Sequence, residues 1–190
     1  FLNLYEKIES DELVSIFASK LICKGSKNKK YSHHQTDFAM YIDIKNFYRI
    51  LSAGLVCNRE VFSSVGLFDE EMGLGKNFGG SEEADLIVRA ITKNKKICYD
   101  PSLIVYHPED PAKIEDIVKI FKKGFSYGKG RGALFAKHDL LNSNLVLILM
   151  NFLYPIFGAI KNLLSFKFLF ISSNIGQFIG RIYGYYEYKK

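Results

Sequence analysis

The apolar run Leu145–Ile160 constrains the fold of this 190-residue chain more than any other feature. It is broken by one asparagine and one proline, and as a helix it would extend only ~24 Å, less than the ~30 Å hydrocarbon core of a bilayer. A second apolar run, Leu163–Ile171, is interrupted by Lys167, and tyrosines and lysines follow it. This composition is typical of a segment that lies in, or dips into, a bilayer surface. Two alternatives are a tilted span through Lys161 and a helical pair packed on the domain itself.

Positive charge is concentrated in the same region. Residues 1–110 carry 14 Lys and Arg against 16 Asp and Glu, whereas residues 111–190 carry 12 against 4. This asymmetry indicates an anionic partner. Because the excess charge stands beside long apolar runs, a membrane surface is favoured over nucleic acid. We therefore expect a domain at residues 1–140 and a hydrophobic, basic, membrane-associated helical tail at residues 141–190.

The first 140 residues have the pattern of an α/β fold. With 48% hydrophobic and 24% charged residues, the chain is neither disordered nor collagen-like, and three widely spaced cysteines argue against a zinc ribbon or a disulfide framework. Apolar periodicity, capping residues and glycines predict helices over Ser10–Lys24, Arg59–Val65 and Glu82 to about Lys93, and one that begins near Pro111 and runs to Gly124. Strands are expected at Phe38–Ile44, Ile50–Cys57, Lys96–Tyr99 and Leu103–His107. Loops are expected at Lys24–Thr36, at the glycine-rich Glu70–Ser81 and at Tyr127–Gly132, the last one flexible and basic.

The segment most informative about chemistry is residues 53–107. It contains, in order, A-G-L-V-C-N-R-E-V-F-S-S-V-G-L-F-D-E-E, G-G-S-E-E-A-D-L-I-V-R-A and K-I-C-Y-D-P-S-L-I-V-Y-H-P. This series resembles the C-terminal half of family-2-type glycosyltransferases of the GT-A fold. There an N-x-x-x-R-R-E-like turn, G-x-F-D-E, an acidic G-E-D-x-D-L helix start, I-x-Y-x-P and V-x-H follow one another. The matching positions are Gly54, Arg59, Glu60, Gly66, Phe68, Asp69, Glu70, Gly80, Glu82, Glu83, Asp85, Leu86, Arg89, Tyr99, Pro101, Val105 and His107.

The resemblance covers about residues 50–135, since the basic segment Tyr127–Ala133 is similar to the Y-G-R-G segment of membrane-associated members. It implies a partial GT-A (Rossmann-like) fold followed by an apolar helical tail. It also implies an inverting hexosyltransferase that moves a sugar from a nucleotide sugar to a lipid-linked or polysaccharide acceptor. Such an enzyme would work with a divalent metal (Mg or Mn) at the cytoplasmic face of the cell membrane, peripherally or monotopically.

Glu82 and Glu83 are the candidate catalytic pair. An inverting transfer needs a base for the acceptor hydroxyl, and a positioned carboxylate is suitable. Both side chains stand in the expected first helical turn after Ser81, where the helix dipole favours the anionic form. By resemblance Glu83 occupies the position of the base, where aspartate is usual, and Glu82 could share or replace that role. First-turn carboxylates also stabilise helices without any chemistry.

Four further residues have expected roles. Asp85 is expected to pair with Arg89 on the helix surface and to help line the acceptor site. By resemblance His107 contacts the metal or the donor diphosphate, the alternative being a strand-end histidine bonded to backbone. Lys129 and Arg131 are expected either to close over the donor diphosphate, to meet lipid phosphates, or to lie in a solvated loop.

The donor half of the resembled fold has no counterpart here. The chain has no D-x-D motif and no opening apolar strand with a nucleotide-binding turn. We therefore expect that Phe1 is internal to a longer protein whose N-terminal half binds most of the metal and nucleotide, and that the isolated fragment is inactive. The alternative function is a non-catalytic module that binds a membrane surface.

Overall fold

The computed structural model describes residues 6–7, 13–25, 35–108, 117–143 and 145–190. It has two compact units. The first comprises residues 1–67 and 86–111, and the second comprises residues 68–85 and 112–190. Helix α3 (Glu82–Thr92) contributes its first turn to the second unit and the rest to the first. The division expected at residue 140 stays a prediction.

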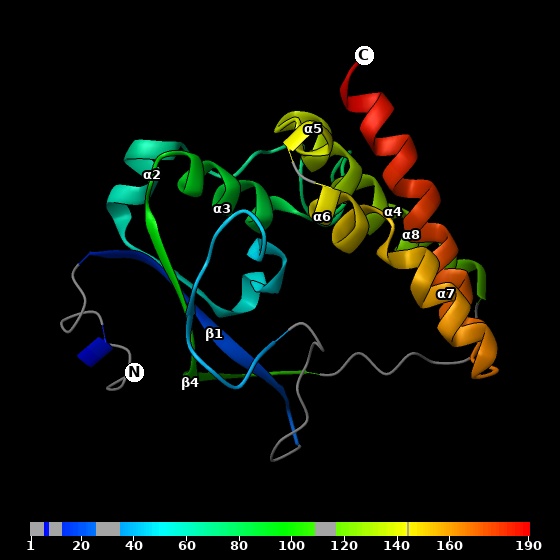
Figure 1. The fold of residues 1–190 in the computed structure, drawn as a ribbon, viewed down its shortest axis with the longest axis horizontal. Coiled ribbons are helices and arrows are strands. Elements are labelled where there is room, and N and C mark those ends of the chain that lie inside the picture. The colour runs from blue at the N-terminus through cyan, green and yellow to red at the C-terminus, as the bar shows by residue number, and fades with distance from the viewer. Residues whose placement is uncertain (1–5, 8–12, 26–34, 109–116, 144) are drawn as a thin grey trace. The chain divides into compact units, whose positions relative to one another are not determined.

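A four-stranded mixed sheet forms the first unit, in the order β2-β4-β1-β3. β1 (Val14–Cys23) pairs in parallel with β4 (Lys96–His107) and antiparallel with β3 (Leu55–Cys57). β2 (Met40–Tyr41) pairs antiparallel with the other edge of β4. Figure 1 shows β1 and β4 in dark blue and green. The α/β class expected from the sequence is confirmed.

The expectation of a helix over Ser10–Lys24 is wrong for the residues that the structure describes. Residues 14–23 form the central strand β1. Most of its side chains are buried on both faces of the sheet, Ile16 and Leu21 almost completely, and neighbouring strands pair with both of its edges. A strand buried on both faces loses its alternating pattern, so its apolar residues also fit helical spacing. Residues 10–12 lie outside the described part.

The strand predictions around Pro101 are confirmed with one change. The two expected segments are a single strand, β4, whose register against β1 shifts between Ser19 and Lys20. Ser19 is opposite Asp100 and Lys20 is opposite Ile104, so β4 has extra residues there. Proline lacks the N–H that a continuous ladder needs, which favours an irregularity at this point.

The two strands expected between residues 38 and 57 are much shorter than predicted. Only Met40–Tyr41 and Leu55–Cys57 pair as β2 and β3. Between them are two 3-10 turns, η1 (Phe47–Arg49) and η2 (Ser52–Gly54). Ile50, predicted as the first residue of the second strand, instead follows the turn η1 and is buried, so its apolar character reflects a buried turn rather than a strand.

Helix α2 (Arg59–Val65) agrees with the prediction in both of its bounds. The Asn58 side chain accepts a hydrogen bond from the Glu60 N–H at 3.0 Å and caps the helix. Gly66 follows at φ 82°, a conformation that favours glycine and ends the helix.

Helices make up most of the second unit. They are α4 (Ile117–Lys137), α5 (Leu140–Ser143), α6 (Leu145–Leu147), the π-helical turn η3 (Ile148–Phe152), α7 (Tyr154–Leu164) and α8 (Phe168–Tyr188). The flexible basic loop expected at Tyr127–Gly132 is wrong, because these residues lie inside α4. The part of the expected preceding helix at residues 109–116 lies outside the described residues.

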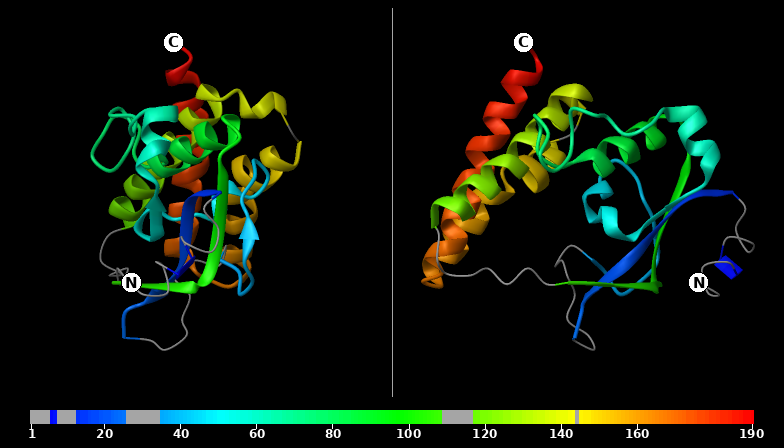
Figure 2. Two further views of the ribbon diagram at one scale, coloured as in Figure 1. Left: turned by 90° about the vertical axis from the view of Figure 1, so that its left-hand side faces the viewer. Right: turned by 180° about the vertical axis from the view of Figure 1, so that it is seen from behind.

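Glycines explain how α4 and α8 pack. A Cβ at Gly128 would lie 2.8 Å from the Gln177 carbonyl carbon, and one at Gly132 would lie 2.8 Å from that of Arg181. The relation is reciprocal, since a Cβ at Gly184 would lie 2.8 Å from the Lys129 carbonyl carbon. The two backbones therefore touch along a parallel pair of helices, as small residues spaced by four allow. Figure 2 shows α8, in orange and red, beside α4 in both views.

The apolar tail consists of α6, η3, α7 and α8. Helix α8 packs against α4 within the second unit, and the expectation that the tail lies at a bilayer surface stays a prediction. Along the described residues, every helix is too short or too polar to cross a bilayer.

Candidate active site

The first turn of α3 follows a glycine-rich loop that bends back sharply. Gly80 has φ 85° and Ser81 has φ 72°, so two successive residues adopt left-handed backbone. The Ser81 carbonyl oxygen accepts the first helical hydrogen bond, from the Asp85 N–H at 2.9 Å. This turn fixes the direction in which the side chains of Glu82 and Glu83 leave the helix.

The same loop lies directly against helix α4. A Cβ at Gly130 would lie 2.6 Å from the Gly79 carbonyl oxygen, and a Cβ at Gly80 would lie 2.9 Å from the Tyr127 ring. Ordinary side chains would push the loop and the helix apart. Glycine on both sides therefore brings the beginning of α3 close to the middle of α4, where Lys129 and Arg131 stand.

Glu83 and Arg131 interact electrostatically in this second unit. Burial raises the pKa of Glu83 above its usual range, and the neighbouring Glu82 raises it further. The Arg131 guanidinium and the N–H groups of Glu83 and Ala84 act in the opposite direction without cancelling the rise. Burial lowers the pKa of Arg131, and Glu83 partly offsets this. The result is a half-buried carboxyl of raised basicity beside a guanidinium.

Glu82 lies under the glycine loop. A Cβ at Gly73 would lie 3.7 Å from its Oε2 atom. That oxygen is buried and has no hydrogen-bond partner among the described residues. The two adjacent carboxylates thus have different surroundings, because Glu83 faces Arg131 whereas Glu82 faces loop backbone.

Asp85 is completely buried and takes part in a polar network. Its Oδ1 atom lies 2.8 Å from Lys137 Nζ and 2.8 Å from His138 Nε2. Lys137 also reaches Asp69 Oδ2 at 2.7 Å. Burial alone would raise the pKa of Asp69, but the bonds from Lys137 and the Glu71 N–H outweigh it and lower that pKa.

Lys137 and His138 were not among the site residues predicted from the sequence. Their signal is only that two polar residues directly follow the buried run Ala133–Ala136.

For Arg89, a structural role is supported, since its guanidinium donates to the carbonyls of Val65, Gly66 and Leu67 after helix α2. The expected pairing of Arg89 with Asp85 stays a prediction, as does the acceptor contact of Asp85.

Lys129 is held by contacts rather than carried on a loop. Its ammonium donates to Asn77 Oδ1 at 2.9 Å and pairs with Glu187 Oε2 at 2.8 Å. It also lies 5.3 Å from the centre of the Phe78 ring and 5.4 Å from that of Tyr183. Lys129 therefore joins the glycine loop to α8, and its predicted contact with a diphosphate stays a prediction.

His107 ends strand β4 in the first unit. Its Nδ1 atom lies 2.8 Å from the Pro108 carbonyl oxygen, which is the backbone-bonded arrangement weighed above. Within the part of the chain that the structure describes, no three Asp, Glu, His or Cys side chains cluster closely enough to hold a metal. The predicted contact of His107 with a metal or a donor diphosphate stays a prediction.

The chain was compared with protein-family models, curated proteins and solved structures, and none of the three comparisons gave a significant match. Only the motifs of this chain and the geometry of its own residues therefore bear on its function.

Proposed function

We propose that the chain is the acceptor-side part of an inverting glycosyltransferase that uses a nucleotide sugar, with Glu83 as the general base. The observation that carries the proposal is the position of Glu83. It stands in the first turn of α3, after the glycine loop, half-buried and beside Arg131. The ordered motifs of residues 53–107 support the same class of enzyme.

The raised pKa of Glu83 suits the chemistry. In the transfer, the acceptor hydroxyl oxygen forms a bond to the anomeric carbon, and the bond from that carbon to the nucleoside diphosphate breaks. Glu83 takes the hydroxyl proton, and the leaving group departs with the electron pair of the broken bond. A carboxylate made more basic by burial accepts this proton more readily than an exposed glutamate would.

Arg131 and Glu82 adjust the base in opposite directions. Arg131 favours the ionised form of Glu83, which must be present before the proton is taken, whereas Glu82 disfavours it. Burial and Glu82 thus keep the pKa of Glu83 raised, while Arg131 limits the rise so that the carboxylate can still form. Glu82 is the reserve candidate for the base, because it is adjacent in the same turn.

The proposal includes partners. The acceptor is a lipid-linked or glycan hydroxyl at the cytoplasmic face of a membrane, and the donor is a nucleotide sugar used with a divalent metal, Mg or Mn. Nucleic acid is not a proposed partner, because the excess positive charge of residues 111–190 accompanies long apolar runs.

The test uses the full-length protein with Glu83→Gln. Glutamine keeps the shape of the side chain but cannot take a proton, so we expect kcat to fall about 10²- to 10⁴-fold, with donor binding unchanged. Release of nucleoside diphosphate from a panel of nucleotide sugars, with a lipid-linked acceptor extract, measures kcat. Glu60→Gln is the matched control, since Glu60 also stands in a first helical turn but is exposed in the other unit.

A second variant tests the electrostatic argument. Arg131→Met removes a group that lowers the pKa of Glu83, so the acidic limb of the pH–kcat profile should move to higher pH. Full turnover by Glu83→Gln would contradict the assignment of the base and direct attention to Glu82. If the full-length wild type turns over none of the donors yet binds membranes, the non-catalytic module becomes the better account.

A further inference from the structure

The turn between α7 and α8 exposes an unusual group of apolar side chains. Leu164 is 76% exposed and Phe166 is 80% exposed, and Leu163 and Phe170 on either side are 57% and 54% exposed. Helix α7 ends at Leu164 and α8 begins at Phe168, so these residues surround the tip of a helical hairpin. Large apolar side chains gathered at one exposed tip indicate a binding surface.

The beginning of α4 lies at the same end of the second unit. Ser172 Oγ, in the second turn of α8, donates to the Ile117 carbonyl oxygen at 3.1 Å. The parallel packing extends this contact, since a Cβ at Gly124 would lie 3.1 Å from the Ser173 carbonyl carbon. Ile117 and Val118 are 51% and 55% exposed and therefore enlarge the apolar surface at the hairpin tip.

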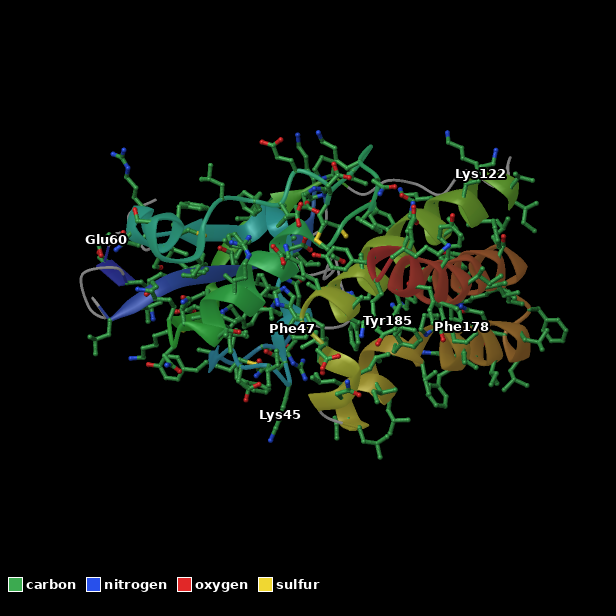
Figure 3. The ribbon with its side chains drawn as sticks, turned by 90° about the horizontal axis from the view of Figure 1, so that it is seen from above. Lys45, Phe47, Glu60, Lys122, Phe178 and Tyr185 are labelled. Atoms are coloured by element: carbon green, nitrogen blue, oxygen red, sulfur yellow. The ribbon has the colours of Figure 1, made fainter. Side chains whose placement is uncertain are left out.

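Among the residues that the structure describes at this end, every charged side chain is a lysine. Five exposed lysines surround the apolar group: Lys119, Lys122, Lys123, Lys161 and Lys167. Figure 3 shows Lys122 projecting outward from α4. The acidic residues from position 117 onward are Asp139 and Glu187. Asp139 follows the end of α4 and Glu187 lies in the last turn of α8, both at the opposite end of these helices.

We infer that this end of the second unit, the basic tip, binds the surface of an anionic phospholipid bilayer. The basic tip comprises the exposed apolar residues at 117, 118, 163, 164, 166 and 170 and the five lysines. Lysine ammonium groups would meet lipid phosphates, while Leu164 and Phe166 enter the boundary between headgroups and acyl chains. Charge complementarity selects this occupant, because the tip has five cations, no acidic side chain among its described residues, and exposed leucine and phenylalanine.

The tip gives the proposed site a defined position relative to the lipid. Lys119 and Arg131 stand on the same helix, twelve residues apart, which corresponds to ~18 Å along α4. The site would thus be held at a fixed height from the headgroups. Lipid binding itself goes beyond the transferase proposal and holds whether or not the chain catalyses transfer.

Vesicle co-sedimentation of the full-length protein tests the inference. We compare vesicles of pure phosphatidylcholine with vesicles of phosphatidylcholine and phosphatidylglycerol at 3:1. Binding should require phosphatidylglycerol and weaken as salt is added. The double variant Lys161→Gln/Lys167→Gln should bind about 25-fold more weakly, at about fivefold for each cation removed. Leu164→Ser and Phe166→Ser should also weaken binding.

Matched controls keep the test specific. Leu67→Ser removes a leucine that is 75% exposed, against 76% for Leu164, and Lys45→Gln removes an exposed lysine of the first unit. Both should bind as the wild type does, and thermal melting should show all variants folded. Equal binding to both vesicle types, or tip variants that bind like the controls, would overturn the inference. Retention on DNA without vesicle binding would do so too. Glu83→Gln should bind vesicles normally, so the outcome is independent of the transferase test.

Discussion

Alanine at Gly132 would strain the contact between α4 and α8 at its tightest region. A Cβ at this position would lie 2.8 Å from both the Arg181 carbonyl carbon and the Tyr185 backbone nitrogen, and still closer to the Arg181 carbonyl oxygen. Ordinary contacts begin at 3.4 Å. These neighbours are backbone atoms of a helix, so they cannot turn aside as a side chain can. The helices must separate along their length.

Two opposing effects set the magnitude. Replacing glycine by alanine inside a helix normally stabilises it by about 1 kcal/mol. Overpacking a close contact costs about 3 kcal/mol, or more where only backbone can yield. The net expectation is a loss of at least about 2 kcal/mol, which corresponds to a fall of about 4–8 °C in Tm for a protein of this size. The sign is thus opposite to the one that helix propensity alone predicts.

Thermal unfolding followed by far-UV circular dichroism measures the change. Gly158→Ala is the control, because its Cβ would meet only side-chain atoms of Asn174, at 3.0 Å, and an amide can move. We expect Tm to rise slightly or stay unchanged for Gly158→Ala and to fall for Gly132→Ala. If Gly132→Ala is as stable as Gly158→Ala, the close packing of α4 on α8 is refuted.

Three further predictions concern the polar contacts. Asp85→Asn should lower the free energy of unfolding by about 3 kcal/mol, because a fully buried partner of Lys137 loses its charge; denaturant titration measures this. The lowered pKa of Asp69 implies stability that is present above about pH 4 and lost as pH falls further. Burial acts to lower the pKa of Lys137, but Asp69 and Asp85 outweigh it and raise that pKa. The stability that Lys137 contributes therefore persists up to about pH 10 and is lost at higher pH. The free energy of unfolding measured across pH should fall at both the acidic and the basic end, and Asp69→Asn should flatten the acidic fall. Arg89→Lys should destabilise by about 2 kcal/mol in the same titration, since one ammonium cannot reach all three carbonyls after α2, and an unchanged midpoint would contradict this role.

Local signals in the sequence predicted the elements whose ends are set by capping, helix-ending or strand-interrupting residues. Helix α2 was found in both bounds because Asn58 caps it and Gly66 ends it within the chain itself. The start of α3 was found from its acidic first turn. Strand β4 was found as two pieces because Pro101 interrupts its pattern. In each case the deciding residues are neighbours in sequence.

Elements decided by distant partners could not be predicted in this way. β1 is a strand because β3 and β4 pair with its edges, and nothing within residues 14–23 shows that they do. The position of Glu83 in a first turn was predicted from sequence, but its neighbour Arg131 was expected on a mobile loop. Lys137 and His138 became partners of Asp85 only through the packing of α4 in the second unit.

The glycines of residues 128–132 explain both the wrong loop prediction and the candidate site. Glycine at every second position indicates a flexible segment when the chain is considered alone. Within a helix, however, two residues correspond to about 200° of rotation, so alternate positions lie on opposite faces. Gly128 and Gly132 accordingly contact α8, whereas Gly130 contacts the loop at Gly79 and Gly80. Tyr185, labelled in Figure 3, lies on α8, and its backbone nitrogen is among the atoms that a Cβ at Gly132 would meet.

One helix can thus be approached by backbone from two sides, and Arg131, between Gly130 and Gly132, is held where it can act on Glu83. A sequence that favours flexibility in isolation therefore specifies a closely packed helix, because the entropy that glycine loses on folding is offset by contacts no larger residue would permit.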